Sequence, residues 1–64
     1  MRNVWRVLFP DNKGGTWVTE VDAHELTGET TVKHQVWLKL CRDGADVEPN
    51  TGTAEIIGQL ADEE

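Results

Sequence analysis

Two neighbouring segments of this chain, residues 17–24 and 33–40, carry alternations that let them pair as antiparallel strands. The first has uncharged side chains at its odd positions and two acidic residues and a histidine among its four even positions, whereas the second has its aliphatic side chains at even positions. A turn at residues 27–30 would set Val21 opposite Val36 and so make one face of the pair apolar. Because a one-residue slip would mix the two kinds of side chain, the pattern predicts two strands in one register.

A further strand is predicted over residues 3–9, which are rich in β-branched and aromatic side chains and precede a cluster of turn formers. The same register sets Phe9 opposite Trp17 and Arg6 opposite Glu20, and therefore extends the apolar face. The sequence thus predicts a mainly β fold, a small antiparallel meander with three main strands.

The segment 53–60 decides how the apolar face is covered. Ile56, Ile57 and Leu60 have helical spacing, but Gly58 and the adjacent isoleucines favour a strand, which we expect. A strand would close the meander into a curled SH3-like barrel, whereas a short C-terminal helix on the sheet would give an α+β fold. The expected cover consists of Val47, Ile56, Ile57 and Leu60.

The length of 64 residues allows a single small domain, with residues 61–64 expected to form a disordered acidic tail. A domain of this size buries only about 60% of the surface that its unfolded chain exposes. Cys41 is the single cysteine and cannot close an intrachain disulfide, so we expect a homo-oligomer to add stability. The lone thiol and an N-terminal segment interrupted by Arg2 and Arg6 favour a cytoplasmic protein, and no segment is long enough for a membrane-spanning helix.

The net charge of −6, from 12 acidic and 6 basic residues, disfavours direct binding to nucleic acid. Nucleic-acid affinity rests on Lys and Arg side chains that neutralise phosphates. An acidic surface fits a protein partner with a basic face, and it also fits the simpler role of keeping a small protein in solution.

Trp37 is the first candidate for partner binding, because the expected register places it beside Leu8 and Val18 on the polar face of the sheet. An apolar island within a charged surface is typical of a binding site, and Trp is enriched at binding hot spots. The alternative is that the C-terminal segment of the chain itself folds over this island.

Glu20, Asp22 and His24 project from one face of their expected strand and are weak candidates for a metal site. Consecutive side chains on one face of a strand lie about 7 Å apart, which is too far for all three to converge on one ion. Cross-strand ion pairs with Arg6 and with the lysines of the neighbouring strand explain these residues more simply.

The sequence predicts no catalytic residues and no cofactor. We expect His34 on the apolar face as a neutral, hydrogen-bonded side chain too far along its strand from Cys41 to activate the thiol. Asp43, Asp46 and Glu48 do not have the spacing of a calcium loop, so they predict a solvated acidic turn.

These features favour a non-enzymatic protein–protein interaction or assembly module that self-associates or docks on a larger partner. One alternative is a small acidic inhibitor of the kind found in viruses or mobile elements, whose Asp43, Asp46 and Glu48 would mimic nucleic acid at a basic site. The other alternative is a small metal- or ligand-binding module that uses Glu20, Asp22 and His24.

Overall fold

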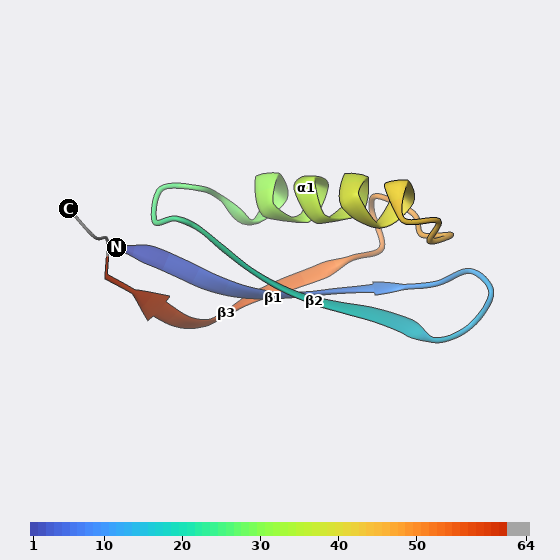
Figure 1. The fold of residues 1–64 in the computed structure, drawn as a ribbon, viewed down its shortest axis with the longest axis horizontal. Helices are drawn as coiled ribbons and strands as arrows, with labels where there is room; N and C mark the ends of the chain where they lie inside the picture. The colour runs from blue at the N-terminus through green and yellow to red at the C-terminus, as the bar shows by residue number, and fades with distance from the viewer. Residues whose placement is uncertain (62–64) are drawn as a thin grey trace.

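The computed structural model describes residues 1–61 of the chain, which form three antiparallel strands in one open sheet and one helix (Figure 1). The predicted tail at residues 61–64 lies, apart from Ala61, outside the described residues. The mainly β class is confirmed. In chain order the elements are β1 (Arg2–Pro10), β2 (Thr16–His24), α1 (Glu29–Arg42) and β3 (Thr53–Leu60).

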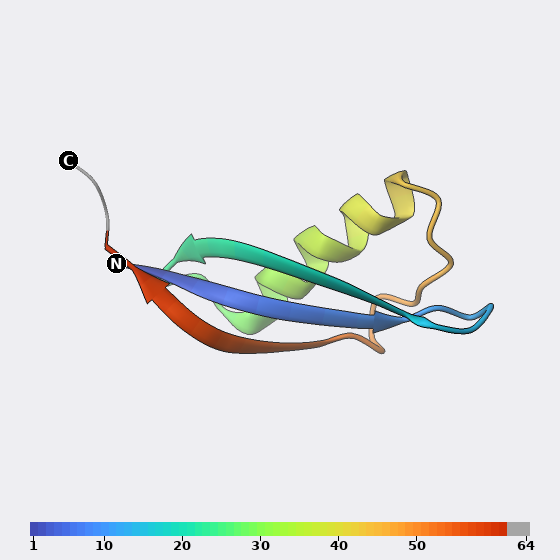
Figure 2. The same cartoon turned by 60° about the horizontal axis from the view of Figure 1, so that its bottom comes forward.

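The strand order in the sheet is β2-β1-β3, so that β1 is the central strand and runs antiparallel to both neighbours (Figure 2). In a meander the third strand would pair with the second, but here the chain leaves β2, passes through α1 on one face of the sheet, and returns beside β1. The helix therefore connects two edge strands that run parallel to each other. Of the helices in residues 1–61, none combines the length and the apolar character needed to cross a bilayer.

The predicted pairing of the first two strands is confirmed. Phe9 lies opposite Trp17, and Arg6 lies opposite Glu20, along a ladder that runs without interruption from Arg2 to Pro10. The alternation of buried and half-buried side chains along β1 shows the two faces expected of a strand packed on one side.

The predicted strand at residues 33–40 is wrong, because this segment lies within the helix α1. Val32, Val36 and Leu40 are buried at intervals of four residues. Residues four apart lie on one face of a helix, and they also lie on one face of a strand. His34 lies between them and is exposed, and the side chain of Leu38 is 45% exposed, which only helical geometry explains. The glycine of the expected turn is the N-cap residue of this helix.

The expected strand at residues 53–60 is confirmed as β3, but it does not close a barrel. It lies at one edge of the open sheet, and the register of its pairing with β1 shifts between Val4 and Trp5. Val4 pairs with Gly58 and Trp5 with Ile56, so Ile57 is skipped in the ladder. Such a bulge adds local twist to the strand that carries it.

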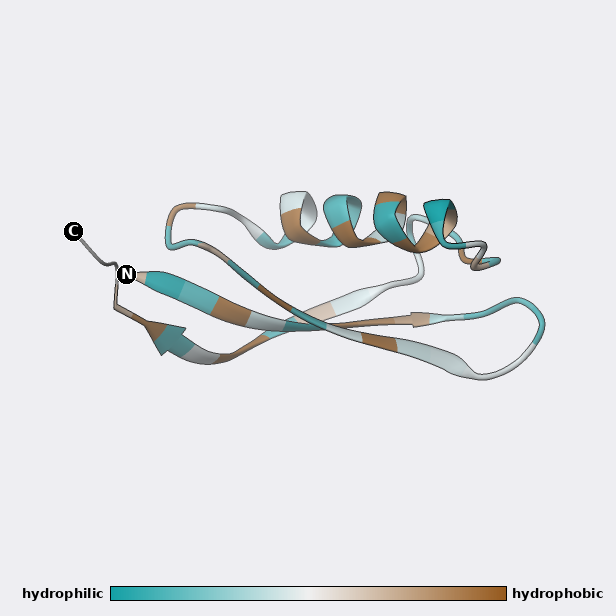
Figure 3. Cartoon of the chain, in the orientation of Figure 1, coloured by the Kyte–Doolittle hydropathy of each residue, from teal (hydrophilic) through white to brown (hydrophobic). Residues whose placement is uncertain are grey.

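The hydrophobic core lies between the sheet and α1, and Figure 3 shows hydrophobic segments of the helix turned toward the strands. Val47, from the loop after the helix, is buried as expected, whereas Ile56, Ile57 and Leu60 are exposed because the helix takes their expected place as the cover. The buried hydrophobic residues are Trp5, Val7, Phe9, Val32, Val36, Leu40 and Val47.

Candidate interaction surface

The face of the sheet that points away from α1 is uncovered within residues 1–61 (Figure 1). Strand alternation and the pairing registers assign its members, because the side chains of cross-strand partners lie on the same face. We call this surface the open face. Its residues are Arg2, Val4, Arg6, Leu8, Pro10, Thr16, Val18, Glu20, Asp22, His24, Thr53, Glu55, Gly58 and Leu60.

Two cross-strand ion pairs cross the open face. Arg2 Nε donates to Asp22 Oδ2 over 2.6 Å, and Arg6 Nη2 lies 3.2 Å from Glu20 Oε2. The hydrogen bond from Arg2 and its positive charge hold the pKa of Asp22 below its ordinary value. The arginines thus engage both carboxylates that the sequence offered as weak metal ligands.

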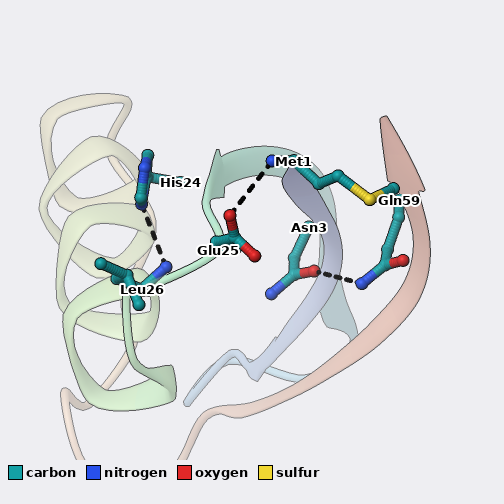
Figure 4. Close-up of polar contacts among 6 residues, drawn as sticks. All are labelled: Met1, Asn3, His24, Glu25, Leu26 and Gln59. Atoms are coloured by element: carbon teal, nitrogen blue, oxygen red, sulfur yellow. Dashed lines mark hydrogen bonds and ion pairs between the residues drawn. The ribbon is translucent and has the colours of Figure 1, made fainter. Parts of the chain in front are cut away.

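His24, the third weak metal candidate, is turned toward the backbone. Its Nδ1 accepts a hydrogen bond of 3.1 Å from the backbone N–H of Leu26 (Figure 4). Among residues 1–61 no group of three or more His, Cys, Asp or Glu side chains is placed to hold a metal ion.

Leu8 and Val18 form the expected apolar pair, because they lie directly opposite each other on the open face. Leu8 is half-buried, and the side chain of Val18 is 59% exposed. The prediction that Trp37 lies beside this pair is wrong. Trp37 belongs to α1, packs half-buried against the core, and donates from Nε1 to the backbone oxygen of Val47 over 3.0 Å.

The free edge of β3 is an apolar surface that the sequence did not reveal. Ile56, Ile57 and Leu60 are 50%, 40% and 50% exposed, and no strand pairs with their outer side within the described chain. The sequence identified these residues as apolar but assigned them to the core. Leu60 is exposed because it lies opposite Arg2 on the open face, whereas Ile56 lies opposite Trp5 on the α1 side and is exposed at the edge of the sheet.

Polar contacts fix the ends of the sheet near the N-terminus (Figure 4). Gln59 Nε2 on β3 donates to Oδ1 of the buried Asn3 on β1 over 3.1 Å. The amino group of Met1 lies 3.2 Å from Glu25 Oε1, which ties the start of β1 to the chain after β2. The bond between Gln59 and Asn3 thus holds β3 against β1 and leaves the outer side of β3 exposed.

Two loops meet at the other end of the molecule, where the hairpin between β1 and β2 contacts the loop after α1. Asp11 accepts hydrogen bonds through Oδ2 from Trp17 Nε1 at 2.8 Å and through Oδ1 from the backbone N–H of Lys13 at 2.7 Å. These bonds, the one from Trp17 above all, lower the pKa of Asp11 below its ordinary value. The backbone N–H of Asn12 donates to the oxygen of Asp46 over 2.8 Å and joins the loops.

The three acidic candidates lie in or beside this loop contact and are all exposed. Asp43 is the C-cap residue of α1, and Asp46 and Glu48 follow in the loop. Asp46 Oδ1 accepts a hydrogen bond of 3.1 Å from Asn12 Nδ2, so this carboxylate has a structural partner.

His34 and Cys41 both lie on α1 and are exposed. The prediction that His34 lies on the apolar face is therefore wrong. Its ring centroid lies 5.8 Å from that of Trp37. Residues seven apart on a helix are separated by about 10 Å along its axis. Activation of a cysteine nucleophile needs the imidazole within hydrogen-bond reach of the thiol, and this separation keeps the two groups apart.

No protein-family model, no curated protein sequence and no solved structure matches this chain.

Proposed function

We propose that this protein is a non-enzymatic assembly module that self-associates through the side of its sheet that α1 leaves uncovered. The observation that carries the proposal is the one-sided packing of the sheet. α1 covers one face, while the large apolar side chains of Val18, Ile56, Ile57 and Leu60 remain 40–59% exposed on the open face and the β3 edge. Exposed apolar surface of this kind is typical of sites that contact another polypeptide.

The small core supports the same proposal. Seven buried hydrophobic residues stabilise the described chain, and a second subunit would add apolar burial that the monomer lacks. The single exposed thiol of Cys41 fits a reducing compartment, and we place this assembly role in the cytoplasm.

Sedimentation equilibrium of the full chain tests the proposal. We expect the average mass to rise above the 7.2 kDa of one chain as the protein concentration increases. A range from about 1 µM to about 1 mM covers association free energies from about −8 to about −4 kcal/mol. A constant mass of one chain over this range would contradict a role in self-assembly.

A further inference from the structure

We propose that His24 is a pH-sensitive element of the fold, which fixes the turn between β2 and α1 only while its imidazole ring is neutral. The observation that carries this proposal is the hydrogen bond of 3.1 Å from the backbone N–H of Leu26 to Nδ1 of His24 (Figure 4). An imidazole nitrogen accepts a hydrogen bond only when it carries no proton. This role lies within one chain and does not depend on the proposed assembly function.

The bond gives His24 a role that Asn and Asp usually have in turns. In an Asx-turn, a side-chain oxygen accepts a hydrogen bond from the backbone N–H two residues later. Here a ring nitrogen of residue 24 accepts from the N–H of residue 26 in the same way. The oxygen of an Asn accepts at every pH, whereas histidine side chains ordinarily change charge between about pH 5 and pH 8. A histidine at this position therefore makes the turn sensitive to pH near neutrality.

The geometry also assigns the tautomer of the neutral ring. Because Nδ1 accepts from Leu26, the single proton of the neutral imidazole lies on Nε2. The second proton binds to Nδ1, which then becomes a donor and faces another N–H group. The hydrogen bond is lost, and the ring and the N–H of Leu26 separate.

The turn leads directly into α1, and His24 holds it in two ways. Besides the bond at Nδ1, the backbone oxygen of His24 accepts from the N–H of Thr27 over 2.8 Å. Gly28, the N-cap residue of α1, gives the first turn of the helix no side-chain hydrogen bond. Loss of the bond to Leu26 therefore loosens the connection through which the chain passes from the sheet to its helical cover.

The charged side chains nearest to His24 on β1 and β2 are paired with each other. Arg2 lies opposite His24 and pairs with Asp22, whose pKa is held below its ordinary value first by the hydrogen bond from Arg2. In the first turn of α1, Glu29 lies 3.5 Å from Lys33. Carboxylates, lysines and arginines ordinarily keep their charge between about pH 5 and pH 8. A change of the turn in this range therefore points to another group.

The amino group of Met1 is the second nearby group of a kind that titrates near neutral pH. It lies 3.2 Å from Oε1 of Glu25, the residue between His24 and Leu26. On β3, the residue opposite Arg2 is the uncharged Leu60. A substitution at His24 separates the two titrations, because it leaves Met1 and Glu25 in place.

NMR titration of the full chain tests the proposal with the wild type, His24→Asn and His24→Phe. Asn keeps an acceptor and does not titrate, whereas Phe keeps a planar ring and has no acceptor. In the wild type, the amide resonance of Leu26 should shift with the same midpoint as the ring of His24. Nitrogen chemical shifts of the neutral ring should show Nδ1 without a proton. In His24→Asn this midpoint should be absent, and any pH dependence that remains belongs to Met1.

Hydrogen exchange at the amide of Leu26 measures the size of the effect. At about pH 8, the protection factor should be about two- to tenfold higher in the wild type and in His24→Asn than in His24→Phe, as expected for one hydrogen bond. At about pH 5, the wild type should match His24→Phe, while His24→Asn keeps its protection. The amide of Thr27 is the internal control, because its acceptor is the backbone oxygen of residue 24 in all three proteins.

Two results would overturn the proposal. One is a neutral ring that carries its proton on Nδ1, and the other is a protection factor of Leu26 in the wild type that is equal at both pH values. The wild-type titration decides even if a variant does not fold, because it compares the ring and the amide within one protein. Neither result bears on the oligomeric state, which sedimentation measures separately.

Discussion

The indole Nε1 of Trp37 donates a hydrogen bond of 3.0 Å to the backbone oxygen of Val47. This contact joins the solvent-facing flank of α1 to the loop that leads into β3. Val47 is itself buried, so the bond fixes a core residue that comes from a loop. Trp37 therefore stabilises the monomer, and its substitution cannot be used by itself to test partner binding.

Two substitutions of Trp37 should lower the free energy of unfolding by different amounts. Trp37→Phe keeps an aromatic ring but removes the donor to Val47, and should cost about 1 kcal/mol. Trp37→Ala also removes the packing of the half-buried ring, and should cost about 2–3 kcal/mol. Urea denaturation measures both, and Leu38→Ala on the exposed side of the helix should change stability by less than about 0.5 kcal/mol. Equal losses for Trp37→Ala and Leu38→Ala would show that the ring contributes nothing to the monomer.

Gly52 packs directly against the ring of Phe9. A Cβ added at this buried glycine would lie 2.8 Å from Cδ1 of Phe9 and closer still to Cε1 and Cζ. Because Phe9 is fully buried, its ring has little room to move, and Gly52→Ala should lower the free energy of unfolding by about 1–3 kcal/mol.

The same substitution at Gly58 is the control, because an added Cβ there meets no atom within 4 Å. Gly58→Ala should leave stability unchanged or raise it by up to about 1 kcal/mol, since alanine reduces the freedom of the unfolded chain. Thermal denaturation at low protein concentration compares the two variants without a contribution from assembly. Similar stabilities would mean that the ring of Phe9 can move aside.

Acid should weaken the contact between the two loops at Asp11. The pKa of this carboxyl is lowered in the folded chain from its ordinary value of 3.8, first by the hydrogen bond from Trp17 and then by that from Lys13. The stability contributed by the carboxylate is therefore fully present above pH 3.8 and is lost as the pH falls through the lower folded-state value. Chemical denaturation as a function of pH should show this loss, and Asp11→Asn should reduce it.

Two variants check that this acid effect arises at Asp11. Trp17→Phe removes the main hydrogen-bond donor, so the pKa of Asp11 should rise toward 3.8, which carboxyl NMR titration measures. Asp43→Asn removes one negative charge from the same end of the molecule and should keep the acid-dependent loss. An unchanged Asp11 titration in Trp17→Phe would refute the assignment.

The ion pair between Arg6 and Glu20 should contribute little to stability. Both side chains are about half exposed, at 44% and 54%, although Arg6 donates to the carboxylate from both Nε and Nη2. A double-mutant cycle with Arg6→Gln and Glu20→Gln should give a coupling energy of about 0.2–1 kcal/mol. The coupling should shrink further at about 1 M salt. A coupling well above this range that persists at high salt would mean that the open face is shielded from solvent.

Part of the candidate surface could be predicted from the sequence. The pairing of Leu8 with Val18 and of Arg6 with Glu20 followed from alternation and from the short loop between the first two strands. The position of Trp37 could not, because it depends on whether its segment is a strand or a helix. The exposure of Ile57 at the β3 edge depends on the same choice, since only a helical cover leaves this residue outside the core.

The sequence by itself determined the strands β1, β2 and β3 and the register of the first hairpin. Period-two alternation and turn-forming residues are local, and a slip of one residue would bury charge. Only the tertiary structure decided that residues 29–42 are helical, because apolar residues four apart fit both the helical period of 3.6 residues and the strand period of two. The face formed by Val32, Val36 and Leu40 packs on Trp5, Val7 and Phe9, and this packing between segments distant in sequence selects the helix and leaves the β3 edge exposed.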